Sequence, residues 1–254
     1  MKVSMRISEA RHSFFALLIG AAVWELVGRT LHFSFLPPFS NVVLAALDLI
    51  ASGQILGFLA ASLVSLAIGY VLASLCGMIL GLLMGYYRRV EYVMEPYVYA
   101  FFTAPKLVFV PILYALFGIG RDTQVAIVFL SAFFVIVINT MGGIRNVDAS
   151  CIEMARSFGA SERQLFWKVL LPGALPLTMA GLRLGVGRAV KGMISGEMFI
   201  ALFGLGALLR KYGSQFDSEK VFAILLVVIG VALLCSYTAQ TIERRIIAWT
   251  EQGQ

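Results

Sequence analysis

Residues Asp148–Pro172 read DASCIEMARSFGASERQLFWKVLLP and form a polar interruption in an otherwise apolar chain. Asp148 is a suitable N-cap for a first short helix, and Gly159 is a suitable left-handed stop at its C-terminal end. Ser161, with a glutamine three residues later, predicts a capping box at the start of a second helix, which Pro172 is expected to close. Each helix is far shorter than the roughly 20 apolar residues that cross a bilayer. We therefore expect this stretch, called the 148–172 loop, to lie outside the membrane.

The second helix of the loop is amphipathic. None of its charged residues lies on its apolar face, which consists of Leu165, Phe166, Val169 and Leu170. Such a face predicts packing against other helix ends of the same protein.

The composition indicates a membrane protein. Hydrophobic residues make up 60% of the 254 residues and charged residues only 13%. A soluble domain averages about 25% charged residues, so we expect an all-α polytopic membrane protein with a single domain over residues 1–254. Orientation in the membrane explains the net charge of +6 better than binding to nucleic acid does, and we expect no nucleic-acid partner.

Six apolar segments predict six transmembrane helices, with the 148–172 loop between the fourth and the fifth. The basic start of the first segment also resembles a signal peptide, but no convincing small-x-small cleavage site follows, which favours an uncleaved span. Ser40 is expected to cap a short surface helix over Val42–Ala51, and the third span is expected to start after Pro96. The predicted spans are 13–28, 56–86, 97–118, 123–142, 173–203 and 221–242.

Lysine and arginine are unevenly divided between the two sides of this topology. Eleven lie on the side of both termini and of the 148–172 loop, against five on the opposite side. The positive-inside rule therefore predicts that both termini and the loop are cytoplasmic. The eleven are Lys2, Arg6, Arg11, Arg88, Arg89, Arg145, Arg156, Arg163, Lys168, Arg244 and Arg245, and the five are Arg29, Arg121, Arg210, Lys211 and Lys220.

Ionisable residues inside the predicted spans need an explanation, because each costs at least ~2.5 kcal/mol at the bilayer centre on insertion scales. Lys106 lies in the third span between Pro105 and Pro111. These prolines remove backbone donors and predict a kinked or broken helix, which is tolerated where the backbone lines a cavity. Glu25 in the first span needs a basic partner that the sequence does not identify.

The fifth span has one polar face. At 100° per residue, three basic residues fall within an arc of roughly 140° and an acidic residue lies just beyond its edge. With Lys106, these residues are candidates for the wall of a translocation path that suits an anion. The alternative is that they pair internally or snorkel from the helix ends, which we favour for the first of them. The four residues are Arg183, Arg188, Lys191 and Glu197.

Glycines recur at small-x3-small spacing in two of the spans. Gly77, Gly81 and Gly85 lie in the second span, and Gly181 and Gly185 lie in the fifth. This spacing predicts close helix packing, since glycine lets helix backbones approach in lipid. The contact is expected either within one chain or across a dimer.

The sequence does not predict an enzyme. No G-x-x-x-x-G-K-[ST] phosphate loop occurs, and no Ser-His-Asp set, HExxH or paired-carboxylate site can be assembled. The three cysteines form no CxxC pair, and neither His12 nor His32 has ligand-like neighbours, so we expect no metal site. ATP hydrolysis is expected on a separate subunit.

The 148–172 loop resembles the EAA loop of ABC-importer permeases. That loop runs Glu-Ala-Ala, three residues, Gly, nine residues, Ile, one residue, Leu-Pro. This chain differs from it only in Met154 for alanine and Val169 for isoleucine. The resemblance implies a pair of helices that couples the permease to an ATPase. The residues that it assigns to this coupling are Glu153, Met154, Ala155, Gly159, Ala160, Ser161, Leu171 and Pro172.

The resemblance extends along nearly the whole chain to the nitrate/sulfonate/taurine branch of binding-protein-dependent permeases. Segments that carry it include Leu36-Pro37-Pro38, Gly181-Leu182-Arg183 and Gly204-Leu205-Gly206. It implies a bacterial inner-membrane homodimer, two ATPase subunits that hold ATP and magnesium, and an extracytoplasmic solute-binding protein. Alternating access would carry a small solute inward, anionic in our interpretation. Members of the branch also carry bicarbonate, thiamine precursors or riboflavin-like molecules.

Two other classes of protein fit the sequence less well. A secondary transporter driven by an ion gradient also uses broken helices and charges at the membrane midplane. However, it leaves the spacing of the 148–172 loop unexplained, and no inverted repeat is visible. An intramembrane enzyme is disfavoured because the catalytic residues are missing.

Overall fold

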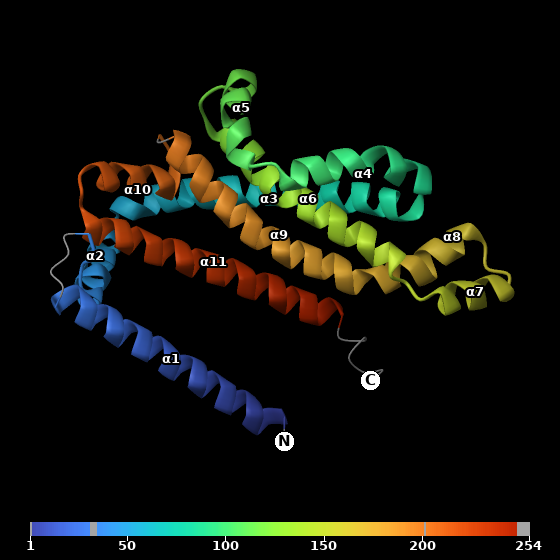
Figure 1. The fold of residues 1–254 in the computed structure, drawn as a ribbon, viewed down its shortest axis with the longest axis horizontal. Helices are drawn as coiled ribbons and strands as arrows, with labels where there is room; N and C mark the ends of the chain where they lie inside the picture. The colour runs from blue at the N-terminus through green and yellow to red at the C-terminus, as the bar shows by residue number, and fades with distance from the viewer. Residues whose placement is uncertain (1, 31–34, 201, 248–254) are drawn as a thin grey trace.

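The computed structural model describes residues 2–30, 35–200 and 202–247. All regular structure in these ranges is helical, and several of the helices run side by side along the long axis of the molecule (Figure 1). The elements are α1 (Lys2–Thr30), α2 (Phe39–Ala51), α3 (Gln54–Tyr86), α4 (Arg88–Thr103), η1 (Lys106–Phe109), α5 (Val110–Phe117), α6 (Arg121–Arg145), α7 (Ala149–Ser157), α8 (Glu162–Leu165), η2 (Phe166–Leu170), α9 (Leu171–Ile200), α10 (Gly204–Ser214) and α11 (Ser218–Ile246).

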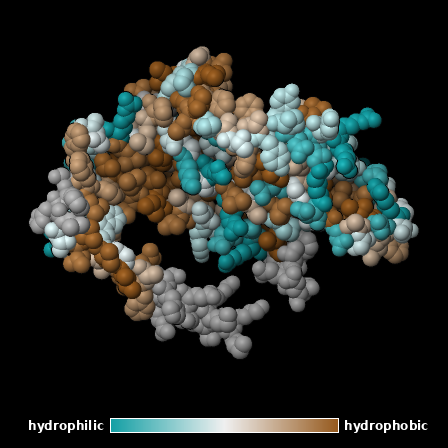
Figure 2. Space-filling model, in the orientation of Figure 1, coloured by the Kyte–Doolittle hydropathy of each residue, from teal (hydrophilic) through white to brown (hydrophobic). Residues whose placement is uncertain are grey.

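Helix α6 is the central helix of the bundle and packs against both α3 and α9. Half of its apolar window is buried within the chain, against 11% of the corresponding window of α11. Val128, Ala132 and Ile136 of α6 are completely buried in the cluster that joins the three helices. Ala223 and Ile224 near the start of α11 are buried, whereas Ile229, Leu233 and Leu234 further along it are exposed. Hydrophobic residues also cover much of the visible molecular surface, as expected where lipid or another chain covers a protein (Figure 2).

Both rows of glycines pack on α6 within one chain. A Cβ atom on Gly81 of α3 would lie 2.7 Å from the Cβ of Thr140, and one on Gly181 of α9 would lie 2.5 Å from the Cβ of Asn139. These distances are too short for any larger residue without movement of the helices. Of the two alternatives, a contact within one chain or a contact across a dimer, the structure shows the contact within one chain.

Four helices are long and apolar enough to cross a membrane: α3, α6, α11 and the continuous helical stretch Glu162–Phe199. The bent pair of α4 with the η1–α5 segment would make a fifth span. These counts cover the described residues only. The expected total of six spans therefore stays a prediction.

The predicted third span consists of two helices that meet at a sharp bend. α4 begins at Arg88, so Pro96 lies inside that helix and the expected start after Pro96 is wrong. α4 ends at Thr103 because Ala104, which precedes Pro105, takes an extended conformation. The following segment leaves at 98°, and the break expected around Lys106 is therefore present.

Ser40 joins two helices rather than capping one. α2 begins at Phe39, and the backbone N–H and hydroxyl of Ser40 donate hydrogen bonds to the Glu25 carboxylate at 2.8 and 2.9 Å. Arg29, one turn further along α1, donates to the same carboxylate at 2.6 Å. The costly charge of Glu25 thereby finds a basic partner and ties α1 to α2.

Candidate functional site

The first helix of the 148–172 loop is capped as its sequence predicts. The carboxylate of Asp148 accepts a hydrogen bond from the backbone N–H of Ser150 at 2.9 Å, which lowers the pKa of Asp148 from its ordinary value. Gly159 follows the helix with a φ of +76°, a conformation that side chains with a Cβ rarely adopt. The loop therefore turns where glycine permits it.

The second helix begins as predicted but does not end at Pro172. The N–H of Gln164 donates to the Ser161 hydroxyl at 3.4 Å, and the Ser161 N–H donates to the Gln164 side chain at 2.9 Å, so the capping box is confirmed. α8 then runs through the π-helical segment η2 directly into α9, whose second residue is Pro172. The proline is tolerated because the π turn before it has already shifted the hydrogen bonding where its N–H is missing: the Leu171 N–H bonds to the Phe166 carbonyl, five residues back.

One face of the loop is fastened to the ends of three long helices. Leu165 and Leu170 are buried against Ile144 at the end of α6 and Ala174 at the start of α9. At the end of α3, the Tyr86 ring meets Phe166 edge to face at 5.2 Å. The apolar stripe of the second helix therefore packs as its pattern predicts. It holds the loop to α3, α6 and α9.

The opposite face of the loop is open. Glu153 and Met154 are exposed on α7, and so is Phe158, which follows its last residue; Met154 and Phe158 are 59% and 86% exposed. The remaining candidates of the coupling segment are half-buried, apart from the exposed Gly159 and Ser161; the half-buried ones are Ala155, Ala160, Leu171 and Pro172. Exposed methionine and phenylalanine side chains beside charged residues are typical of a protein-binding surface.

Three of the predicted pathway residues meet in one cavity between η1, α6 and α9. Lys106, Arg188 and Lys191 line a space of about 170 Å³. The Phe102 ring lies beneath two of these cations, 5.6 Å from the Lys106 ammonium and 5.7 Å from the Arg188 guanidinium. The hydroxyl-bearing Ser131 also lines the space, and none of its lining residues is a carboxylate. The cavity is chemically suited to an anion.

The other two pathway candidates lie outside this cavity. Arg183 pairs with Glu243 of α11 at 3.1 Å, which is the internal pairing considered as the alternative. Glu197 is completely buried near the end of α9. Its carboxylate accepts hydrogen bonds from the Gln124 side chain of α6 and, at 2.9 Å, from the Gly206 N–H of α10. Both residues therefore fasten helices together.

The partners of Glu197 could not be identified from the sequence. Gln124 lies 73 residues away, and Gly206, although only nine residues away, donates through its backbone. Nearby, in the corner where α9 and α10 meet, the Ser62 hydroxyl of α3 accepts a hydrogen bond from the Leu205 N–H at 2.9 Å. The signal that could have pointed to this corner is the Gly204-Leu205-Gly206 segment itself, since closely spaced glycines indicate a close approach. Within the described ranges, no group of three His, Cys, Asp or Glu side chains could hold a metal ion.

Comparisons with known proteins agree with this architecture. Residues 73–248 match the family model of the binding-protein-dependent transport system inner membrane component. The chain is 31% identical to the aliphatic sulfonates transport permease protein SsuC of Bacillus subtilis, over 90% of this chain and 83% of that protein. It is also 31% identical to the formylaminopyrimidine transport permease protein ThiX of Halalkalibacterium halodurans, over 99% of this chain and all of that protein.

A solved structure of the methionine ABC transporter MetNI, in an inward-facing conformation, shares the fold. The TM-score is 0.63 at 20% identity, and the match covers 76% of this chain and 94% of that one. The family match spans more than half of the residues, and the relatives align over most of their own length. The chain therefore belongs to the family of binding-protein-dependent transport system inner membrane components, the permeases of ABC importers.

Proposed function

We propose that the 148–172 loop is the surface on which a separate ATPase subunit docks. The observation that carries this proposal is the division of the loop into two faces, one fastened to α3, α6 and α9 and the other exposed. A body held in this way passes a displacement of its partner to three helices at once. In this proposal Glu153 orients the interface, Met154 and Phe158 enter the partner surface, and Gly159 allows the turn between the two coupling helices.

The proposed assembly contains two copies of this chain and two ATPase subunits, which bind ATP and magnesium. A solute-binding protein delivers the solute from outside, and alternating access moves it to the cytoplasm. The loop and both termini face the cytoplasm. The excess of lysine and arginine on their side supports this orientation, and the outward-facing apolar side chains of α11 are consistent with cover by lipid or a second copy.

The transported solute is a small anion in this proposal. Support comes from the cavity lined by Lys106, Arg188 and Lys191 and from the lack of a carboxylate among its lining residues. The named solutes of the two relatives differ, so family membership alone does not choose the solute. Sulfonates fit because their oxygens accept hydrogen bonds from lysine, arginine and serine side chains together.

Uptake into proteoliposomes tests both parts of the proposal. The chain is reconstituted with the ATPase that co-purifies with it and with its binding protein, and ATP-driven uptake of labelled taurine and other alkanesulfonates is measured. Arg188→Gln and Lys191→Gln should each lower uptake roughly tenfold, because each variant loses a charge-assisted hydrogen bond to the transported anion. Arg244→Gln, an exposed change at the end of α11, should leave uptake unchanged.

Two results would overturn the proposal. Unaltered uptake of sulfonates by both cavity variants would remove these residues from the path. Uptake that continues when the ATP site of the ATPase is disabled, and that stops when ionophores dissipate the ion gradients, would favour the secondary transporter.

A further inference from the structure

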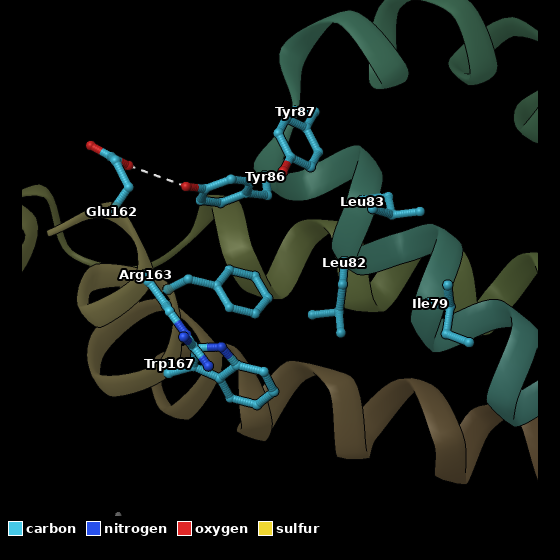
Figure 3. A pocket seen from close by; sticks show the side chains of 9 residues that line it. Ile79, Leu82, Leu83, Tyr86, Tyr87, Glu162, Arg163 and Trp167 are labelled. Atoms are coloured by element: carbon cyan, nitrogen blue, oxygen red, sulfur yellow. Dashed lines mark hydrogen bonds between the residues drawn. The ribbon is translucent and has the colours of Figure 1, made fainter.

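A second hollow lies beside the 148–172 loop, between the last turns of α3 and the segment formed by α8 and η2 (Figure 3). Its volume is about 470 Å³. Along α3 it is lined by Ile79, Leu82 and Leu83. α3 is one of the helices that can cross the membrane, so this apolar wall continues the lipid-facing surface of the protein.

Aromatic side chains close the hollow where α3 ends and the polar loop begins. Tyr86 and Tyr87 stand at the end of α3, and Phe166 and Trp167 stand opposite on η2. Tyrosine and tryptophan are enriched at the level of the lipid headgroups because one end of each side chain is apolar and the other is polar. Trp167 is 60% exposed, so its indole ring is available to a ligand.

The charge that remains available in the hollow is positive. Glu162 is engaged, because the Tyr86 hydroxyl donates to its carboxylate at 3.1 Å and Arg156 lies 3.4 Å from it. Arg163, the other charged residue of the lining, has no hydrogen bond or ion pair within the described part of the chain. Lys168, which follows Trp167 on η2, is exposed but does not line the hollow.

We propose that this hollow is a binding site for an anionic phospholipid of the surrounding membrane. The phosphate of the headgroup lies at Arg163, the glycerol region lies against Trp167, and one acyl chain runs along Ile79 and Leu83. Sign of charge, an interfacial aromatic rim and continuity with the apolar surface of α3 together select this occupant. A zwitterionic lipid also carries a phosphate, but the cation of its own headgroup cancels the net charge that attracts an anionic lipid to Arg163. The proposal concerns a site outside the transport path and does not depend on the identity of the solute.

The site places the lipid in contact with the fastening of the 148–172 loop. Phe166 belongs both to the hollow and to the apolar cluster that holds the loop, and Glu162 begins α8. A bound lipid therefore stabilises the loop in the position seen here. Anionic lipid would then favour productive contact with the ATPase.

Trp167 gives a direct measurement of occupancy. The full chain is placed in nanodiscs of phosphatidylcholine that contain either brominated phosphatidylglycerol or the same amount of brominated phosphatidylcholine, and tryptophan fluorescence is recorded. The difference between the chain and its Trp167→Phe variant isolates the signal of this residue. We expect phosphatidylglycerol to be preferred roughly fivefold, the effect of one basic residue near a membrane surface.

Substitution of the basic residue separates a site from ordinary lipid contact. Arg163→Gln should abolish the preference, whereas Arg245→Gln at the end of α11 should preserve it, and added inorganic phosphate should not compete. Equal quenching by the two brominated lipids would show ordinary boundary lipid and overturn the proposal. Retention of the preference in Arg163→Gln, or no quenching of Trp167 by either lipid because protein covers the hollow, would also overturn it.

Discussion

The two ends of α9 are held in different ways. At its start, short-range devices shape the 148–172 loop: a cap at Asp148, a glycine turn at Gly159 and the capping box at Ser161. At its other end, the buried carboxylate of Glu197 is held by groups from α6 and α10. The caps and the glycine turn are partly exposed, so distorting them costs little free energy. A buried hydrogen-bond network, by contrast, resists any movement that breaks it. We infer that the loop before α9 is adjustable around α7, where the ATPase is proposed to dock, and that the far end of α9 is rigid.

The largest expected effect comes from crowding the buried end. A Cβ on Gly206 would lie 2.5 Å from the Cβ of Glu197 and 2.7 Å from the backbone nitrogen of Met198, and neither atom can move without the helix. Gly206→Ala should therefore lower the free energy of unfolding by about 3 kcal/mol. Thermal unfolding of the chain in detergent or nanodiscs measures the loss.

Gly213 in the same helix is the matched control. A Cβ there would meet no atom within 4 Å, so Gly213→Ala should leave the midpoint unchanged or raise it slightly. A Gly206→Ala protein as stable as the control would show that the corner of α9 and α10 is not rigid, and the comparison between the two ends would fail.

The structure of the 148–172 loop was largely predictable from sequence, because the interactions that shape it are short-range. Asp148, Gly159 and Ser161 act on neighbours within a few residues, so their effects can be read along the chain. Pro172 is the exception in this region, because the π-helical segment η2 before it has no sequence pattern of its own and packs against residues of α6 and α7.

The buried end could be predicted only in part. Sequence placed Glu197 at the edge of a polar face, but its partner Gln124 is 73 residues away and nothing in either segment indicates the pairing. For the fold as a whole, local patterns were again the predictable part: apolar runs and prolines predicted most helices and the break near Lys106. The helix α10, by contrast, was not predicted, because its first residues are buried by contacts with distant helices.

A smaller effect on stability, with a large one on transport, is expected at Gly159. No atom lies within 4 Å of a Cβ added there, so Gly159→Val introduces only backbone strain, about 1–2 kcal/mol, at a φ of +76°. The exposed turn can relax to relieve it, which displaces α7 from α8. ATP-driven uptake should therefore be lost while the thermal midpoint changes by only a few degrees.

Gly159→Asn separates the effect of strain in the left-handed backbone conformation from the effect of adding a side chain. Asparagine tolerates the left-handed region better than other residues with a Cβ, so this variant should retain much of the uptake. Full uptake by Gly159→Val would contradict the role of the turn. Equal loss in both variants would indicate that the ATPase needs the space beside Gly159 rather than its conformation.

The smallest expected effect is the pH dependence of α7. The hydrogen bond from the Ser150 N–H lowers the pKa of Asp148 in the folded loop, so the cap stabilises α7 at pH values above the ordinary pKa of aspartate. Its contribution is lost as the pH falls through the lowered pKa of the folded state. Hydrogen exchange of the α7 amides, corrected for the intrinsic pH dependence of exchange, should show weaker protection in acid. Asp148→Asn keeps an acceptor for Ser150 but cannot titrate, so the difference between the two proteins isolates this carboxylate from Glu153 and Glu162. If protection falls equally in both proteins, the charge of Asp148 does not stabilise α7.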